Sequence, residues 1–320
     1  MALKTSLTGS YPPTYDLARP IRYLPPDEQD RIVRESISRA VNDQIELGID
    51  VLVDGQVRDD IVSLFARRLP GYEGDALPYR VVRRVRPSKE PMTVQDYLYA
   101  KGLAGGRPLK AHITGPMSIA RASAVESGSG YASRGDPKLV RDLANALGQE
   151  ALCLVEAGAE VVQIDEPVLA YGIDLDLAFE AIQRIIEVGT VPYPGLHVCG
   201  NVTRVLDDIL RRCPVRMVSI EGSWMQHEEL RDIDDKFLAQ HEKQLGLGCI
   251  QVSDYSVEKL RHVQAFLDQM VLRLGEDNIW AVMPNCGLRS VPHHVAKNKL
   301  KVMVEAARFL EGSTWEGRPT

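Results

Sequence analysis

The stretch AEVVQIDEP (159–167) decides the fold, because it is a short, largely apolar run that ends in two carboxylates and a proline. The ring of Pro167 fixes φ and removes the backbone N–H, so the strand stops there. A helical segment over 136–157 precedes the run and a second follows near 175–188. A strand between two helices predicts the repeating unit of an α/β protein.

The same unit recurs along the chain. Apolar runs that end in turn residues predict strands over 3–10, 49–56, 109–116, 159–167, 195–201, 215–223, 245–252 and 278–287. Helical periodicity predicts helices over 27–47, 136–157, 175–188, the segment after Thr203, 257–274 and 292–310. Continuous apolar strands indicate a parallel sheet covered on both faces. Eight strand–helix units predict a single (β/α)8 TIM barrel. A doubly wound open sheet is the alternative, but no glycine-rich dinucleotide fingerprint follows an early strand.

The length of 320 residues fits one such barrel. We therefore expect residues 1–320 to form a single catalytic domain. The Pro- and Arg-rich segment 71–92 is expected to be an excursion between two strands, and the Gly- and Ser-rich segment 125–137 is expected to be an active-face loop.

The composition limits the class of protein. Hydrophobic residues make up 44% and charged residues 26%, which is typical of a folded globular chain. A net charge of −6 without a long basic run argues against nucleic acid as a partner. No apolar stretch approaches the roughly 20 residues of a membrane span, so no membrane partner is expected. An odd number of cysteines, five, and an N-terminus without an apolar core segment predict a cytoplasmic protein with reduced thiols.

Polar residues of the kinds that bind metals and amino acids lie at the carboxyl ends of the predicted strands. In a barrel these ends converge on one face, where catalytic sites are built. The residues at these ends are Ser10, Asp54, Gln56, Asp165, Glu166, His197, Cys199, Glu221 and Cys286.

The strongest local motif is His197-Val198-Cys199, because residues two apart on a strand point to the same side. With Cys286 and Glu221 from other strand ends, these side chains form a plausible tetrahedral zinc set, with ligands at about 2.0–2.3 Å. The alternative is that both cysteines are small buried hydrophobic residues. That reading is preferred for Cys153, Cys213 and Cys249.

The paired carboxylates Asp165 and Glu166 are suited to hold a substrate ammonium group. The alternative reading is that Asp165 caps a helix N-terminus. His112 lies within a predicted strand and is expected to be a core histidine with satisfied hydrogen bonds.

Seven motifs occur in the order and approximate spacing of a known family: TGSYP (8–12), DVLVDGQVRDDIV (50–62), ITGPMSIA (113–120), QIDEPVL (163–169), HVCGN (197–201), SIEGS (219–223) and NCGL (285–288). From about Leu3 to Leu310 the chain resembles the cobalamin-independent methionine synthase family. It is similar to the short, single-barrel form of archaea and some bacteria, which lacks the additional N-terminal barrel of the long members.

The resemblance implies a cofactor, a substrate and a set of site residues. It implies one zinc ion per chain and a homocysteine S-methyltransferase that forms L-methionine from L-homocysteine. The zinc ligands would be His197, Cys199, Glu221 and Cys286. Asp165 would hold the amino group, and Thr8, Gly9 and Ser10 would bind the amino acid carboxylate and amine. The zinc-bound substrate thiolate would attack the methyl group, without a protein nucleophile. Gln56 stands where the family has Glu.

Three departures from the family bear on the methyl donor. Folate-dependent members carry a stacking Trp, a Glu and a proton-donating His where an ungapped alignment places Ala122, Tyr171 and Ser253. A departing folate nitrogen needs a proton, whereas a methylcorrinoid leaves as cobalt(I) and needs none. These differences predict a methylcorrinoid donor, either methylcobalamin or a corrinoid protein.

Three alternatives stay open. The first is a folate-dependent methionine synthase whose donor site is misaligned. The second is another zinc-thiol alkyltransferase, such as one acting on coenzyme M. The third is a non-catalytic zinc protein that binds homocysteine or a corrinoid partner.

Overall fold

A seven-stranded parallel sheet forms the centre of the protein, and the computed structural model describes it within residues 2–309. The strand order is β1-β4-β6-β7-β8-β9-β10, so each strand lies beside the next one of the sheet along the chain. The bounds are β1 Leu52–Val53, β4 Leu109–Thr114, β6 Val161–Asp165, β7 Tyr193–His197, β8 Met217–Glu221, β9 Gln244–Ile250 and β10 Ile279–Pro284.

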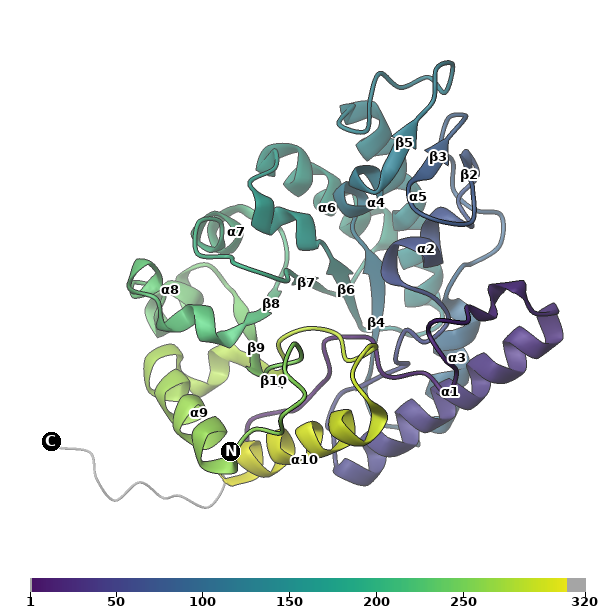
Figure 1. The fold of residues 1–320 in the computed structure, drawn as a ribbon. Coiled ribbons are helices and arrows are strands. Elements are labelled where there is room, and N and C mark those ends of the chain that lie inside the picture. Colours follow the sequence, from purple (N-terminus) through teal and green to yellow (C-terminus); the bar gives the residue numbers. More distant parts are fainter. Residues whose placement is uncertain (1, 310–320) are drawn as a thin grey trace, which may run out of the picture.

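Helices cover the outer face of this curled sheet, as Figure 1 shows. The apolar faces of the helices and strands form one large core cluster, and a second, smaller cluster consists of Val51, Met217, Trp280, Ala281 and Met283. The helices are α1 Pro26–Leu47, α2 Ile61–Ala66, α3 Val94–Leu103, α4 Pro116–Arg121, α5 Pro137–Glu156, α6 Leu175–Gly189, α7 Leu206–Arg212, α8 Asp235–Gln240, α9 Leu260–Leu274 and α10 His293–Phe309. Within the described residues, no helix combines the length and apolarity that a bilayer crossing requires.

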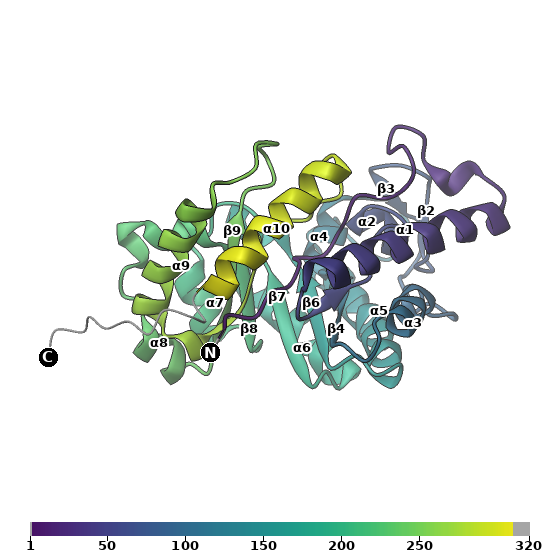
Figure 2. The same ribbon diagram turned by 90° about the horizontal axis from the view of Figure 1, so that it is seen from below.

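The N-terminal segment links the two edge strands of the sheet. Thr5 forms a parallel bridge with Val282 in β10, and Ser6 forms one with Val51 beside β1. The amide of Ser6 donates to the Val282 carbonyl at 3.0 Å, and the amide of Val51 donates to the Thr5 carbonyl at 3.0 Å. Figures 1 and 2 both show the purple N-terminal trace beside α10 and α1.

The predicted fold is confirmed as an α/β architecture with parallel strands and outer helices. The expected strand 3–10 is present as two isolated bridges, in which Thr5 pairs with Val282 and Ser6 pairs with Val51. The other seven predicted strands are found, within a few residues of their expected bounds. Residues 1 and 310–320, which belong to the expected domain, lie outside the described residues.

The predicted excursion contributes to a second, smaller sheet. Strands β2 (Tyr72–Glu73) and β3 (Tyr79–Val81) lie within it and pair with each other, and β3 also pairs with β5 (Ser123–Val125). Arg80 bridges this sheet through ion pairs to Glu73 at 3.0 Å and Glu126 at 2.6 Å. The predicted loop 125–137 follows β5 and leads into α5.

Candidate active site and metal-binding cluster

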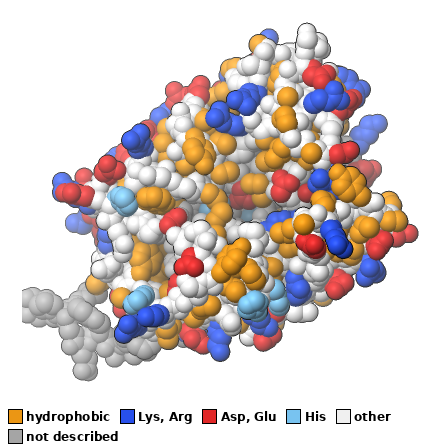
Figure 3. Space-filling model, in the orientation of Figure 1, with side chains coloured by type: hydrophobic (Ala, Val, Ile, Leu, Met, Phe, Trp, Pro, Cys, Tyr) orange, Lys and Arg blue, Asp and Glu red, His pale blue; other side chains and the backbone are white. Residues whose placement is uncertain are grey.

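The carboxyl ends of the strands surround a cavity of about 140 Å³. The face drawn in Figure 3 is hollowed near its centre, where acidic and histidine side chains are visible. Most of the sequence-predicted site residues meet in this cavity. Its lining consists of Thr8, Gly9, Ser10, Gln56, Ile61, Asp165, Pro167, His197, Cys199, Cys286 and Gly287.

Three side chains with metal-binding atoms converge on one point of the cavity. His197 Nε2 lies 2.7 Å from Cys199 Sγ, which lies 2.9 Å from Cys286 Sγ. The ligand atoms of all three residues lie within 4.8 Å of one another. His197 Nδ1 contacts Ser219 Oγ at 3.1 Å, which orients the ring with Nε2 toward the sulfurs. Two sulfurs and an imidazole form a donor set that suits zinc.

The two cysteines of this cluster have opposite shifts in acidity. The hydrogen bond from Cys199 lowers the pKa of the Cys286 thiol to about 4. The same hydrogen bond, together with burial, raises the pKa of Cys199. The lowered pKa of Cys286 favours its thiolate, the form of cysteine that binds metals.

Glu221, the predicted fourth ligand, ends β8 but lies outside this group of three. Its carboxylate accepts hydrogen bonds from Ser223 Oγ at 2.6 Å and from Gln251 Nε2 at 3.0 Å. Both hydrogen bonds reach Oε1 and leave Oε2 outside them, and the role of Glu221 as a ligand stays a prediction.

Asp165 is the buried carboxylate of the cavity. It accepts hydrogen bonds from Gln163 Nε2 at 2.7 Å and from Gln56 Nε2 at 3.3 Å. Burial raises the pKa of Asp165, while His197, Gln163 and Lys110 act in the opposite direction. A cation that enters the cavity beside Asp165 would relieve this desolvation, which suits an ammonium group.

Lys110 is a functional candidate that the sequence analysis missed. It is fully buried, and its Nζ donates to the Leu7 carbonyl at 2.9 Å and to Gln163 Oε1 at 2.6 Å. Gln163 Nε2 in turn donates to both Asp165 and the Thr8 carbonyl. Burial lowers the pKa of Lys110 to about 7. Lys110 thus holds the N-terminal turn and Asp165 together through Gln163.

A period-two pattern could have revealed this network. In LKAHIT (109–114) the polar side chains occupy every second position, so they share one face of β4. His112 and Gln163 are register partners on β4 and β6. His112 is buried as predicted, and its Nε2 lies 2.8 Å from the Thr8 carbonyl. Its Nδ1 has no protein hydrogen-bond partner within the described residues.

The turn 8–10 is fixed by contacts on several sides. Thr8 Oγ1 donates to the Pro284 carbonyl at 2.5 Å, and the Leu288 amide donates to the Ser10 carbonyl at 2.8 Å. A Cβ on Gly9 would lie 2.4 Å from Gln56 Oε1. A side chain at this position would therefore displace the amide of Gln56, which is the flexible end of that side chain.

Gln56 has a backbone φ of +43°, which is uncommon for a residue other than glycine. Such a conformation costs on the order of 1–3 kcal/mol and persists where surrounding contacts impose it. Arg289 Nη1 supplies one such contact by donating to the Gln56 carbonyl at 3.0 Å. The conformation directs the Gln56 amide into the cavity, toward Asp165.

Glu166 is placed differently from its neighbour. It is fully buried and accepts hydrogen bonds from the amides of Met117 at 2.9 Å and Ser118 at 2.7 Å, at the start of α4. Burial raises the pKa of Glu166 to about 7. The carboxylate therefore caps a helix N-terminus, and it is not among the groups that line the cavity. Contact of Glu166 with substrate stays a prediction.

The three positions that suggested a corrinoid donor lie away from the cavity lining. The Ala122 carbonyl accepts from the Tyr79 amide at 3.3 Å, at the junction with the small sheet. The Tyr171 side chain is 76% exposed, and Ser253 lies exposed in the loop after β9. The ungapped alignment therefore selected three residues that do not line the cavity.

The chain is similar to proteins of one family over nearly its whole length. The family described as cobalamin-independent synthase, catalytic domain, matches residues 3–309. A methionine synthase from Methanocaldococcus jannaschii is 34% identical over 291 residues, covering 86% of this chain and 89% of the relative. A methionine synthase from Methanothermobacter marburgensis is 32% identical over 319 residues, covering 95% of this chain and 98% of the relative.

Solved structures with the same fold support the architecture. A B12-independent methionine synthase from Shewanella sp. W3-18-1, in complex with selenomethionine, superposes with a TM-score of 0.80 at 22% identity. The alignment covers 97% of this chain and 98% of that one. A methyltransferase from Methanosarcina mazei gives a TM-score of 0.65 at 16% identity, with 97% and 95% covered.

These matches correct the prediction of the methyl donor. A methylcorrinoid donor, whether methylcobalamin or a corrinoid protein partner, is wrong because the matching family is the cobalamin-independent one. The physical reason for the error is the location of Ala122, Tyr171 and Ser253 outside the cavity lining.

Proposed function

The chain belongs to the cobalamin-independent methionine synthase family and is a methyltransferase that acts on homocysteine; we propose that methyltetrahydrofolate supplies the methyl group. The observation that carries the proposal is the position of the His197–Cys199–Cys286 cluster in the same cavity as Asp165. A thiol-binding group and an ammonium-binding group thus line the same small cavity. Homocysteine carries both a thiol and an ammonium group, so one molecule can contact both.

We propose that His197, Cys199 and Cys286 hold one zinc ion per chain, with Glu221 as the predicted fourth ligand. The donor set supports this, since two sulfurs and an imidazole suit zinc better than magnesium. When bound, the zinc ion would lower the pKa of the homocysteine thiol, which is about 8.5 for a free thiol.

The residues of the chain position the amino acid. Asp165 would accept the ammonium group of homocysteine, with Gln56 beside it. The turn of Thr8, Gly9 and Ser10 would bind the carboxylate, and its place in the lining of the cavity supports this. Holding the sulfur near the methyl carbon makes the reaction effectively intramolecular, which contributes several kcal/mol to the lowering of the barrier.

The transfer itself forms one bond and breaks one. The homocysteine sulfur forms a bond to the methyl carbon, and the bond between that carbon and the folate nitrogen breaks. The electron pair stays on the nitrogen, which takes up a proton. The thiol releases one proton and the folate nitrogen takes up one, so the reaction balances. The products are methionine and tetrahydrofolate.

We also propose that residues 4–7 take the place of an eighth strand and so close the curled sheet into a barrel. The bridges to Val282 and Val51 on both sides support a closed barrel. The chain would then act as a single catalytic domain, and a cytoplasmic location remains our expectation.

The donor is tested by methionine formation. We expect zinc-loaded protein to form methionine from homocysteine and methyltetrahydrofolate in a buffer free of cobalamin. Omitting homocysteine, or removing zinc with a chelator, should abolish the product. If neither the mono- nor the polyglutamate form of the donor yields methionine, folate is not the donor.

A further inference from the structure

A second cavity of about 210 Å³ adjoins the active site. Three loops supply residues to both cavities. Arg58 follows Gln56 by two residues, and Arg289 follows Gly287 by two residues. Tyr15 follows the turn that ends at Ser10. Both cavities therefore open near the carboxyl ends of the strands, and we name the second one the arginine pocket, defined by Arg22, Arg58, Arg289 and Tyr15.

Some charges that line the arginine pocket are already neutralised. Arg58 forms a bidentate pair with Asp96, with both distances at 2.7 Å, and contacts Asp30 at 3.0 Å. Asp59 pairs with Arg67 at 2.9 Å.

Asp60 is also engaged, because it caps α2 by accepting from the amides of Val62 and Ser63. Within residues 2–309, Arg22 and Arg289 have no carboxylate in an ion pair with them. The amide hydrogen bonds leave the charge of Asp60 in place, so the unpaired groups of the arginine pocket carry two positive charges and one negative charge, and their net charge is positive.

Arg289 is held in place although it lacks an acidic partner. It donates to the carbonyls of Gln56 at 3.0 Å and Val57 at 3.1 Å, and to the Tyr15 hydroxyl at 2.6 Å. Its guanidinium carbon lies 5.8 Å from the centre of the Tyr15 ring. These contacts order the guanidinium group without neutralising it, which favours recognition of an anion.

Arg22 supplies the second free charge. It lies in the short 3-10 helix Ile21–Tyr23, with its guanidinium carbon 5.1 Å from the centre of the Tyr23 ring. Its Nε is buried and has no hydrogen-bond partner among the described residues. A buried donor without a partner costs free energy that a bound acceptor would recover.

We propose that the arginine pocket binds the glutamyl carboxylates of the methyl donor. This inference rests on the proposed function, in which the donor is a folate. A folate carries a glutamyl group at the end opposite to its reacting ring, so the ring can face the cluster while the carboxylates reach the neighbouring loops. The arginine pocket shares no lining residue with the cavity proposed to receive homocysteine, so its charge is left available to the second substrate.

The test compares two donors on Arg22→Gln. One is methyltetrahydrofolate, and the other is methyltetrahydropteroate, which lacks the glutamyl group. Loss of a charged hydrogen bond predicts that the KM for methyltetrahydrofolate rises about 10-fold or more. The KM for methyltetrahydropteroate and the KM for homocysteine should change less than twofold. Calorimetric titration with the product, tetrahydrofolate, should show the same loss of affinity.

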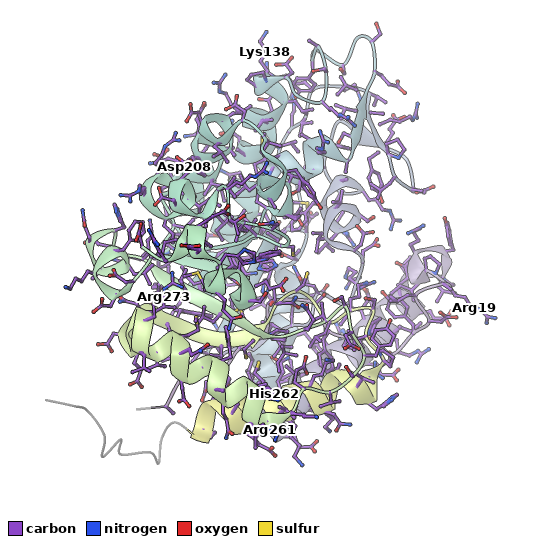
Figure 4. All side chains as sticks on the ribbon, turned by 60° about the vertical axis from the view of Figure 1, so that its left-hand side comes forward. Arg19, Lys138, Asp208, Arg261, His262 and Arg273 are labelled. Atoms are coloured by element: carbon purple, nitrogen blue, oxygen red, sulfur yellow. The ribbon has the colours of Figure 1, made fainter. Side chains whose placement is uncertain are left out.

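Arg19→Gln is the matched control, because Arg19 lies on the same loop and its side chain is 89% exposed. Figure 4 shows it projecting from the outside of the molecule. This variant should behave as the wild type with both donors. Equal KM values for methyltetrahydrofolate in Arg22→Gln and wild type would overturn the inference while leaving the proposed function intact.

Two further outcomes would also overturn it. A rise in the KM for homocysteine alone would assign the pocket to the amino acid carboxylate. A wild-type protein that uses neither donor would remove the proposed function and this inference together.

Discussion

Replacing Cys286 or Cys199 with alanine is expected to empty the metal site and to lower the rate of methionine formation by roughly 10³-fold or more. Each change removes one of the three side chains whose ligand atoms lie within 4.8 Å of one another. Charge stabilisation by a metal ion is worth several kcal/mol, and each 1.36 kcal/mol is tenfold in rate. Zinc content is measured by elemental analysis and activity by methionine formation.

The control for this experiment is Cys153→Ala. Cys153 is half-buried on α5 and packs against the hydrophobic core, outside the cluster. It should keep about one zinc ion per chain. Far-UV circular dichroism should show that all three variants are folded. Wild-type zinc content in both Cys199→Ala and Cys286→Ala would refute the assignment of the ligands.

Asp165→Asn is expected to raise the KM for homocysteine about 10- to 100-fold, since a hydrogen bond to a charged group is worth roughly 1.5–3 kcal/mol. The substitution keeps the shape of the side chain but removes the charge that faces the substrate ammonium. Zinc content should stay unchanged, because Asp165 is not one of the three clustered ligands.

Asp208→Asn is a suitable control, because Asp208 forms an exposed pair with Arg212 on α7 and lies on the outside of the molecule (Figure 4). Steady-state kinetics with varied homocysteine at saturating donor measure both variants. An unaltered homocysteine KM in Asp165→Asn would show that another group holds the ammonium.

The sequence predicted the parts of the molecule that depend on periodicity. Long helices such as α1 and α5 were found with bounds close to those expected, because each buries a repeating apolar stripe. Short helices such as α2 and α8 were not predicted, since six residues carry too little periodicity to be recognised. The N-terminal run was predicted as a strand, yet it pairs only through Thr5 and Ser6.

The sequence also predicted which side chains meet, but not all of their partners. His197, Cys199 and Cys286 were expected together because strand ends converge, and they line one cavity. The role of Lys110 was not predicted, because a lysine within a strand is ordinarily exposed. Its hydrogen-bond acceptors, Gln163 and the Leu7 carbonyl, also come from distant segments of the chain. Glu166 was assigned to substrate because its carboxylate follows that of Asp165. The structure places this carboxylate at the start of α4, and its contact with substrate stays a prediction.

The methyl donor could not be predicted by matching single residues to the family. Ala122, Tyr171 and Ser253 lie at a helix end or in loops, where a gap of one residue changes which side chain faces the cavity. The arginine pocket could not be predicted from the sequence for a related reason. Its charges come from three separate loops, and only the ion pairs of Arg58 and Asp59 show that Arg22 and Arg289 remain free to bind an anion.

The most direct test of the central claim is zinc X-ray absorption spectroscopy of the wild-type protein with and without homocysteine. The account predicts two sulfur ligands, from Cys199 and Cys286, at about 2.3 Å without substrate. A third sulfur should appear when homocysteine is added, and serine, which has no thiol, should leave the spectrum unchanged. A sulfur count that stays at two with saturating homocysteine would contradict thiol activation at this cluster.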